Sequence, residues 1–171
     1  MRIALIGLGR MGANIARRLM RGGHEVVGFD RDQESVRKLS EEGADGATSL
    51  EELAAKLEAP RIFWVMVPAG APTEETVAAL RAIAQAGDVI IDGGNSFFKD
   101  DIRRYRECAD HGVHYVDVGT SGGIWGLERG YCLMIGGDNL VVDMLDPIFA
   151  TLAPGYGTIE RTPGRKGADS R

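Results

Sequence analysis

The chain has few cysteines and no long hydrophobic run, and each shortage excludes a class of protein. Its two cysteines, Cys108 and Cys132, are far apart and match no metal-binding or redox spacing. This usage is typical of free thiols in a reducing compartment, so we expect a cytoplasmic protein without a metal site. No apolar stretch reaches the roughly 18 residues of a transmembrane helix. The glycine-broken N-terminal stretch lacks the features of a signal peptide, and we expect no membrane contact.

Positive charge is also scarce. Lys and Arg number 20 against 25 Asp and Glu, which gives a formal net charge of −5 at neutral pH. A nucleic-acid-binding domain usually carries a basic face, so this balance argues against nucleic acid as a partner. It is compatible with a small anionic ligand, because a helix N-terminus and a few arginines can hold one locally.

What the sequence does contain is a regular alternation of apolar runs and amphipathic stretches. We expect strands within residues 2–7, 25–30, 61–68, 88–96, 113–123 and 131–137. We expect helices within residues 11–19, 33–42, 49–57, 73–87, 99–112 and 141–152. This alternation predicts an α/β fold of the Rossmann type, a doubly wound and mostly parallel sheet with helices on both faces. We expect one domain over residues 1–160, followed by a polar tail at residues 161–171.

The stretch GLGRMG at residues 7–12 matches the pattern G-x-G-x-x-G. It follows a strand and opens a helix, and an acidic residue ends the next strand, which is the context of a dinucleotide-binding turn. In such a turn the first glycine permits the bend, the second admits a pyrophosphate, and the third allows close packing. We therefore predict that this turn binds a dinucleotide through Gly7, Leu8, Gly9, Arg10, Met11 and Gly12.

Asp30 indicates which dinucleotide is preferred. A carboxylate at the end of the second strand can accept both hydroxyls of an adenosine ribose and repels a 2′-phosphate, so the sequence favours NAD over NADP. Arg31 has several possible roles. Its guanidinium could stack on adenine, attract a 2′-phosphate, or be a solvated surface charge.

Two further glycine turns follow strands, DGGNS at residues 92–96 and TSGG at residues 120–123. They should lie at the same edge of the sheet as the first turn. Asn95 offers a donor and an acceptor, and Ser121 with the amides of Gly122 and Gly123 could hold an anion or a hydroxyl. Equally, Asn95 could be a turn residue and Ser121 a helix cap, and the pattern alone leaves both readings open.

Taken together, these motifs resemble the decarboxylating 6-phosphogluconate dehydrogenases, especially their short, NAD-preferring bacterial type within the β-hydroxyacid dehydrogenases. The resemblance rests on GLGRMGANIARRL, on DGGNS with a following DDIRR, and on SGG upstream of GYCLMIGG. It implies that the first turn holds the NAD pyrophosphate and Asp30 the adenosine ribose. For the nicotinamide side it implies Val67, Pro68, Ala69 and Asn95, and for the sugar acid Asn95, Ser121, Gly122 and Gly123.

The resemblance also implies a reaction. 6-Phosphogluconate is oxidised at C3 and decarboxylated to ribulose 5-phosphate, with a lysine as general base on a helix after the nucleotide domain. The lysines of this chain lie in no such context, so we expect no catalytic residue here and no turnover by the chain alone; they are Lys38, Lys56, Lys99 and Lys166. We expect residues 161–171 to begin a linker to a C-terminal helical domain, through which the family usually forms homo-oligomers.

Some positions depart from the family pattern. NADP-using members carry Asn-Arg where this chain has Asp30 and Arg31, and a lysine where it has Pro68. Many members carry an acidic residue where Ile124 stands. Two other readings are a sister enzyme for a small acid such as 3-hydroxyisobutyrate, whose second turn has a D-x-S pattern, and a non-catalytic NAD-binding module.

Overall fold

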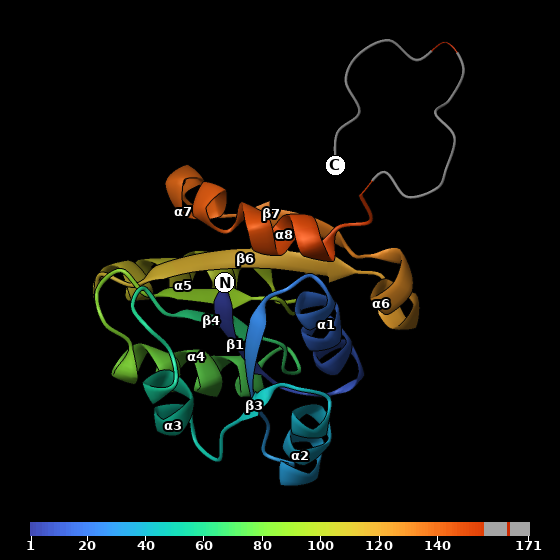
Figure 1. The fold of residues 1–171 in the computed structure, drawn as a ribbon. Helices are drawn as coiled ribbons and strands as arrows, with labels where there is room; N and C mark the ends of the chain where they lie inside the picture. Colours follow the sequence, from blue (N-terminus) through green and yellow to red (C-terminus); the bar gives the residue numbers. More distant parts are fainter. Residues whose placement is uncertain (156–163, 165–171) are drawn as a thin grey trace.

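The computed structural model describes residues 1–155 and residue 164. The predicted domain end at residue 160 and the tail at 161–171 lie outside the described residues, apart from Gly164. Seven strands form one sheet in the order β3-β2-β1-β4-β5-β6-β7 (Figure 1). They are β1 (Arg2–Ile6), β2 (Glu25–Phe29), β3 (Asp45–Gly46), β4 (Ile62–Val65), β5 (Val89–Asp92), β6 (His114–Ser121) and β7 (Cys132–Gly136).

Neighbouring strands are parallel except β6 and β7, which are antiparallel. From β1 the chain builds outward in one direction to β3, and then returns beside β1 with β4 and continues to the other edge. This arrangement confirms the predicted doubly wound sheet, and its strand order reverses between β1 and β4. Ligands of such sheets bind at that switch point, beyond the carboxyl ends of the strands.

Helices cover both faces of the sheet, as predicted. One face carries α1 (Arg10–Arg21), α2 (Gln33–Glu41), α7 (Asn139–Met144) and α8 (Asp146–Leu152). The other carries α3 (Leu50–Ala55), α4 (Ala71–Ile83) and α5 (Phe98–Ala109). A short 3₁₀ turn η1 (Gly123–Trp125) and α6 (Gly126–Arg129) connect β6 to β7. No helix in residues 1–155 is both long and apolar enough to cross a membrane.

The central strands are buried on both faces, which explains their nearly continuous apolar sequences. In β1, Ile3 and Leu5 belong to the core cluster under α1, whereas Ala4 and Ile6 belong to the cluster under α4. The same alternation holds in β4, where Trp64 faces the first cluster and is fully buried. Successive side chains of a strand point to opposite faces, so each central strand must be apolar at every position.

The last predicted helix, at residues 141–152, is wrong as a single element. Two helices stand there, α7 and α8, and they meet at Leu145. Pro147 lies at the start of α8, where it lacks the N–H that a continuous helix would need and its ring would clash with the preceding turn. The two-residue β3 and the four-residue α6 were not predicted, because segments so short show no periodicity.

Candidate dinucleotide-binding site

The turn between β1 and α1 is packed so closely that two of its glycines cannot carry a side chain. Gly7 has a left-handed φ of +92°, and a Cβ on it would lie 2.5 Å from the carbonyl oxygen of Met66. A Cβ on Gly12 would lie 1.9 Å from the carbonyl oxygen of Gly7. The predicted roles of these glycines, a tight bend and close helix–strand packing, therefore agree with the geometry.

Gly9 differs from the other two glycines of the motif. Its φ is −59°, which any residue can adopt, and a Cβ on it would meet nothing within 4 Å. As the N-cap of α1 it makes no side-chain hydrogen bond, and the first turn of α1 contains no acidic residue. The space beside Gly9 is therefore open, and no side chain caps the amides at this helix end, which suits an anion.

Asp30 lies at the end of β2, beside the glycine turn. Its Oδ2 accepts a hydrogen bond from the Leu8 amide at 2.6 Å, and its Oδ1 accepts one from the Asp32 amide at 2.8 Å. The carboxylate therefore holds the glycine turn in place. The sequence predicts a ribose contact for Asp30, but it gives no sign of this second, structural role.

A cleft of about 330 Å³ opens at the switch point, and we call it the switch-point cleft. Six of the predicted cofactor residues line it, namely Gly7, Gly9, Asp30, Arg31, Val67 and Pro68. Arg31 is highly exposed, and its Nη2 lies 3.2 Å from Oε2 of Glu75 on α4. The cleft therefore brings together residues from the loops after β1, β2 and β4, which are far apart in the sequence.

The other predicted cofactor residues lie around the cleft rather than in its lining. Leu8 is a buried core residue, and Met11 packs against the same core cluster. Arg10 and Ala69 are exposed. Sequence reasoning missed five lining residues: Ile6, Phe29, Met66, Pro72 and Thr76. The first three directly adjoin predicted residues, but Pro72 and Thr76 come from α4, which carries no motif.

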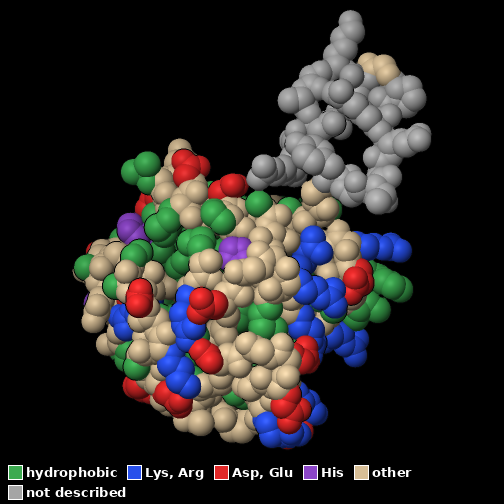
Figure 2. Space-filling model, viewed as in Figure 1, with side chains coloured by type: hydrophobic (Ala, Val, Ile, Leu, Met, Phe, Trp, Pro, Cys, Tyr) green, Lys and Arg blue, Asp and Glu red, His purple; other side chains and the backbone are tan. Residues whose placement is uncertain are grey.

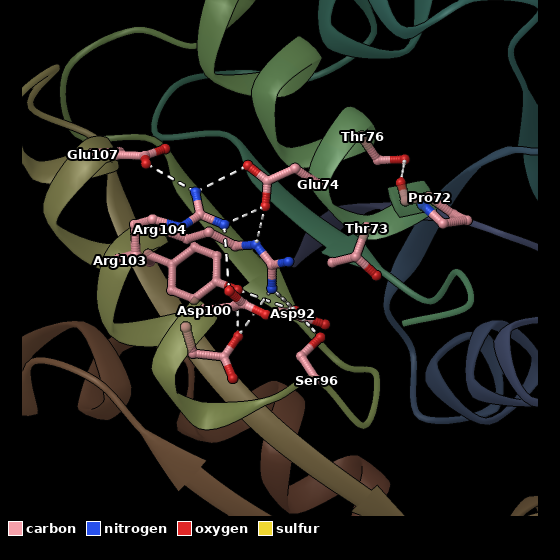
Figure 3. A network of polar contacts seen from close by, with 12 residues as sticks. Pro72, Thr73, Glu74, Thr76, Asp92, Ser96, Asp100, Arg103, Arg104 and Glu107 are labelled. Atoms are coloured by element: carbon pink, nitrogen blue, oxygen red, sulfur yellow. Dashed lines mark hydrogen bonds and ion pairs between the residues drawn. The ribbon is translucent and has the colours of Figure 1, made fainter. Parts of the chain in front are cut away.

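A network of charged and polar groups fixes the DGGNS loop after β5 (Figure 3). Asp92 accepts hydrogen bonds from the Gly94 amide at 3.0 Å and from the Ser96 hydroxyl at 2.7 Å. The guanidinium of Arg104 on α5 lies 3.5 Å from Asp92 and 3.1 Å from Glu74 on α4. Arg104 is only 2% exposed, so this side chain ties α4, α5 and the loop together.

The network gives a physical reason why DGGNS and DDIRR occur together, since Asp92 of the first motif contacts Arg104 of the second. Neither side chain was singled out from the sequence, because their partner Glu74 lies on a different helix. Hydrogen bonds from Arg103, and also from Arg104, lower the pKa of Glu74 to about 2. Glu74 therefore stays ionised throughout the neutral range.

Asn95 is exposed and follows this fixed segment. A Cβ on Gly94 would lie 3.5 Å from the carbonyl oxygen of Val67, so the loop after β5 lies against the loop after β4. The Thr73 hydroxyl donates to the carbonyl oxygen of Pro68 at 3.0 Å and holds that second loop. Asn95 itself does not line the switch-point cleft.

Ser121, Gly122 and Gly123 are exposed at the end of β6. A Cβ on Gly122 would lie 2.8 Å from the ring of Tyr131, whereas one on Gly123 would meet nothing within 4 Å. The α6 segment that follows packs on α1, because Arg18 donates to the carbonyl oxygen of Leu127 at 3.2 Å. These residues share the sheet edge with the cleft but lie outside its lining.

Figure 2 shows Lys and Arg side chains gathered over α1 and α6. Much of this positive charge is paired within the protein: Arg17 lies 2.6 Å from Glu42, and Arg21 lies 2.9 Å from Glu128. Arg10 is exposed at the first residue of α1, next to the open amides of the glycine turn.

Comparison with known proteins agrees with this geometry. A family profile described as the NAD binding domain of 6-phosphogluconate dehydrogenase matches residues 2–160. The chain belongs to this family. The resemblance stated from the motifs is thereby confirmed, and the chain is an NAD-binding domain of the 6-phosphogluconate dehydrogenase type.

Two curated relatives show how much of a longer protein the domain represents. YqeC of Bacillus subtilis is 43% identical over 153 residues, which are 90% of this chain and 51% of that protein. The "6-phosphogluconate dehydrogenase, NAD(+)-dependent, decarboxylating" of Haloferax volcanii is 41% identical over 155 residues, 91% of this chain and 51% of that protein. The chain thus spans about half the length of these curated relatives.

Solved structures share the fold of the domain. The Plasmodium falciparum 6-phosphogluconate dehydrogenase, studied with its cofactor NADP+ and its substrate 6-phosphogluconate, has a TM-score of 0.83 at 29% identity, covering 92% of this chain and 35% of that one. Mycobacterium tuberculosis 3-hydroxyisobutyrate dehydrogenase has a TM-score of 0.82 at 27% identity, covering 90% and 52%. These neighbours confirm a Rossmann-type fold.

The different surroundings of Gly9 and Gly12 predict unequal effects of the same substitution on stability. We expect Gly12→Ala to lower the free energy of unfolding by about 1–3 kcal/mol, because its methyl group would overlap the Gly7 carbonyl. The steric effect outweighs the gain in helix propensity, which is at most about 1 kcal/mol. Gly9→Ala should stay within about 0.5 kcal/mol of the original chain. Urea denaturation followed by circular dichroism measures both values, and equal losses would contradict the assignment.

Proposed function

We propose that this chain is the NAD-binding domain of an enzyme that oxidises and decarboxylates 6-phosphogluconate to ribulose 5-phosphate, CO2 and NADH. The open surroundings of Gly9 are the main support for the coenzyme site in this proposal. Neither its backbone conformation nor its packing requires a glycine, since φ is −59° and no atom lies within 4 Å of a Cβ. A ligand that approaches the backbone at this point explains the absence of a side chain.

The residues around the switch-point cleft fit an adenine dinucleotide. The open amides at the start of α1 would bind the pyrophosphate, and Asp30 would accept the ribose hydroxyls. Val67, Pro68 and Ala69 would lie along the nicotinamide, with Asn95 at its ribose. When bound, NAD accepts a hydride from the substrate carbon that is oxidised.

NAD rather than NADP is the proposed coenzyme. Asp30 would put a negative charge where the 2′-phosphate of NADP would lie. Hydrogen bonds from the backbone amides of Leu8 and Asp32 hold this carboxylate in place. Arg31 carries the opposite charge, but its guanidinium lies 3.2 Å from Glu75, which partly offsets it. The name of the Haloferax volcanii relative, NAD(+)-dependent, supports the same choice.

Two exposed groups at the same sheet edge are proposed to bind the substrate. Asn95 follows the network-fixed DGGNS loop, and Ser121 with the amides of Gly122 and Gly123 ends β6. They would position the sugar acid so that the carbon being oxidised faces the nicotinamide. A sister enzyme for 3-hydroxyisobutyrate is the second candidate, because a dehydrogenase of that acid is among the structural neighbours. The full DGGNS motif favours the phosphosugar acid.

The general base of the reaction is proposed to come from the part of the enzyme that this chain does not span. Lys56 is held by Glu52 at 2.8 Å, and Lys99 lies over the rings of Phe97 and Phe98, so neither points into the switch-point cleft. Relatives about twice as long have room for a lysine-bearing helical domain and for the contacts of a homo-oligomer. We propose that the present chain binds coenzyme without turnover.

Replacing Gly9 tests the coenzyme site. A methyl group at this position would occupy the space of the pyrophosphate, so we expect Gly9→Ala to bind NADH at least about tenfold more weakly than the original chain. Gly136→Ala is the matched control, because its Cβ also meets no atom within 4 Å but lies on β7, far from the cleft. Fluorescence titration measures both, and an unchanged NADH affinity in Gly9→Ala would rule out the proposed pose.

Replacing Asp30 tests the choice between coenzymes. Asp30→Asn removes the negative charge but keeps an oxygen that can accept from the Leu8 amide. We expect the ratio of NADPH to NADH affinity to rise by about tenfold. Asp45→Asn, an equal charge change on β3, should leave the ratio unaltered. Calorimetric titration of both variants with both coenzymes measures this ratio. An equal change of the ratio in the two variants would refute the proposed role of Asp30.

The substrate assignment is tested by nuclear magnetic resonance on the chain saturated with NADH. We expect 6-phosphogluconate to shift the amide signals of Gly122 and Gly123 and the side-chain amide of Asn95, and Ser121→Ala to reduce these shifts. The same concentration of 3-hydroxyisobutyrate should leave the signals in place. Shifts caused by 3-hydroxyisobutyrate alone would favour the sister enzyme instead.

A further inference from the structure

A second hollow, of about 380 Å³, lies between α5 and the last two strands of the sheet, and we call it the α5–β7 groove. It shares no lining residue with the switch-point cleft. In Figure 1, α5 runs along β6 on the face opposite α7 and α8. The groove is lined by Phe98, Asp101, Ile102, Tyr105, Tyr115, Asp117, Gly136, Gly137 and Asp138.

Asp101 contributes a carboxylate oxygen that has no partner. Its Oδ1 accepts from the Tyr115 hydroxyl at 2.9 Å and from the Arg104 guanidinium at 3.3 Å. Its Oδ2 has no hydrogen-bond donor, although the residue is only 6% exposed. Buried carboxylate oxygens are normally paired, and an unpaired one is costly. Asp101 also lines the groove, so a donor seated against its side chain would come next to this buried oxygen.

Asp117 adds a second carboxyl group beside the first. It is the register partner of Asp92 on β5 and of Gly136 on β7, so these residues form a row on the α5 face. A Cβ on Gly136 would meet nothing within 4 Å, so the space beyond Asp117 is open. Burial, together with the charges of Asp101 and Asp92, raises the pKa of Asp117 to about 6.

Negative charge around the groove exceeds the positive charge that touches it. Asp92 faces Asp117 from β5, Asp101 acts on it from α5, and Asp138 lies on the loop after β7. Arg104 is the cation in contact with Asp92 and Asp101, and Glu74 shares it. Two further groups lie at the margin: the Lys99 ammonium lies 6.0 Å from the Phe98 ring, and the His114 side chain lies 3.9 Å from Asp138.

We propose that the α5–β7 groove binds an organic cation, a guanidinium or primary ammonium group on an aliphatic stem. The free oxygen of Asp101 and the carboxylate of Asp117 would accept the N–H groups, and Phe98 and Ile102 would pack against the stem. Tyr105 would close one end, where its hydroxyl donates to Asp138 at 2.9 Å.

The side chains that line the groove favour an organic cation over an anion or a metal ion. Anions are repelled by three neighbouring carboxyl groups. Ca²⁺ and Mg²⁺ need six or more oxygen ligands, and no three metal-ligating side chains cluster in the described part of the chain. Apolar walls beside the carboxylates instead match a charged head on a hydrocarbon stem.

Calorimetric titration with n-butylguanidine tests the proposal, with n-butylurea as an uncharged isostere. At pH 7.5 we expect one n-butylguanidine per chain and no heat with n-butylurea. Asp117→Asn should weaken binding at least about tenfold, whereas Asp143→Asn, the same charge change on α7, should not. Below the pKa of Asp117, at pH 5, the original chain should also bind more weakly, because its carboxyl group is then protonated.

A second measurement guards against a variant that misfolds. In the original chain, n-butylguanidine should shift the amide signals of Gly136 and Gly137 and leave those of Gly7 and Gly9 unmoved, with or without NADH. No shift at millimolar concentration would overturn the proposal. So would equal shifts with n-butylurea, or full affinity in a folded Asp117→Asn variant. None of these outcomes depends on the dinucleotide site.

Discussion

The contact between the turn after β1 and the start of α1 is the constraint on which the site depends. Gly12 lies so close to the carbonyl of Gly7 that no Cβ fits between them, and Gly7 in turn lies against Met66 at the end of β4. Backbone hydrogen bonds from Gly7 to Phe29 at 2.9 Å and from Met66 to Ile6 at 2.7 Å tie the turn to both neighbouring strands. These contacts fix the start of α1 beside the switch point, and with it the position of the uncapped amides.

A second constraint is electrostatic and acts on the opposite half of the sheet edge. Asp92 and Asp117 are opposite each other on adjacent strands, an arrangement of like charges that destabilises a sheet unless other groups compensate. Arg104 supplies one positive charge, and Asp92 uses its own oxygens to hold the DGGNS loop. Arg104 alone cannot neutralise all of these carboxyl groups. The pKa of Asp117 is raised, and one oxygen of Asp101 has no hydrogen-bond partner. The network that holds the DGGNS loop therefore contains more carboxyl groups around Arg104 than this one cation can pair.

How much of this could be predicted from sequence depends on how local the cause is. The turn at residues 7–12 and the doubly wound, mostly parallel class of the sheet were predictable, because glycine turns and the alternation of apolar runs with amphipathic stretches are local signals. The role of Arg104 was not, because it rests on Glu74 and Asp92 from two other elements. Pro72 and Thr76 reach the cleft only because α4 packs beside it, and no local pattern marks them. Pro147, in contrast, was a local signal for the break between α7 and α8 that helical periodicity concealed.

Asp30 has an observed structural role, and the coenzyme contact proposed for it would restrict the same position. Its Oδ2 holds the Leu8 amide, so an apolar replacement would leave that amide without an acceptor and loosen the glycine turn. An asparagine would keep an oxygen for the amide and would lose the negative charge that is proposed to repel a 2′-phosphate. The Asn-Arg pair that NADP-using members carry at this position satisfies both demands. If position 30 selects the coenzyme as proposed, a residue that changes the choice must still accept the Leu8 hydrogen bond, and asparagine meets this demand where a small apolar residue would not.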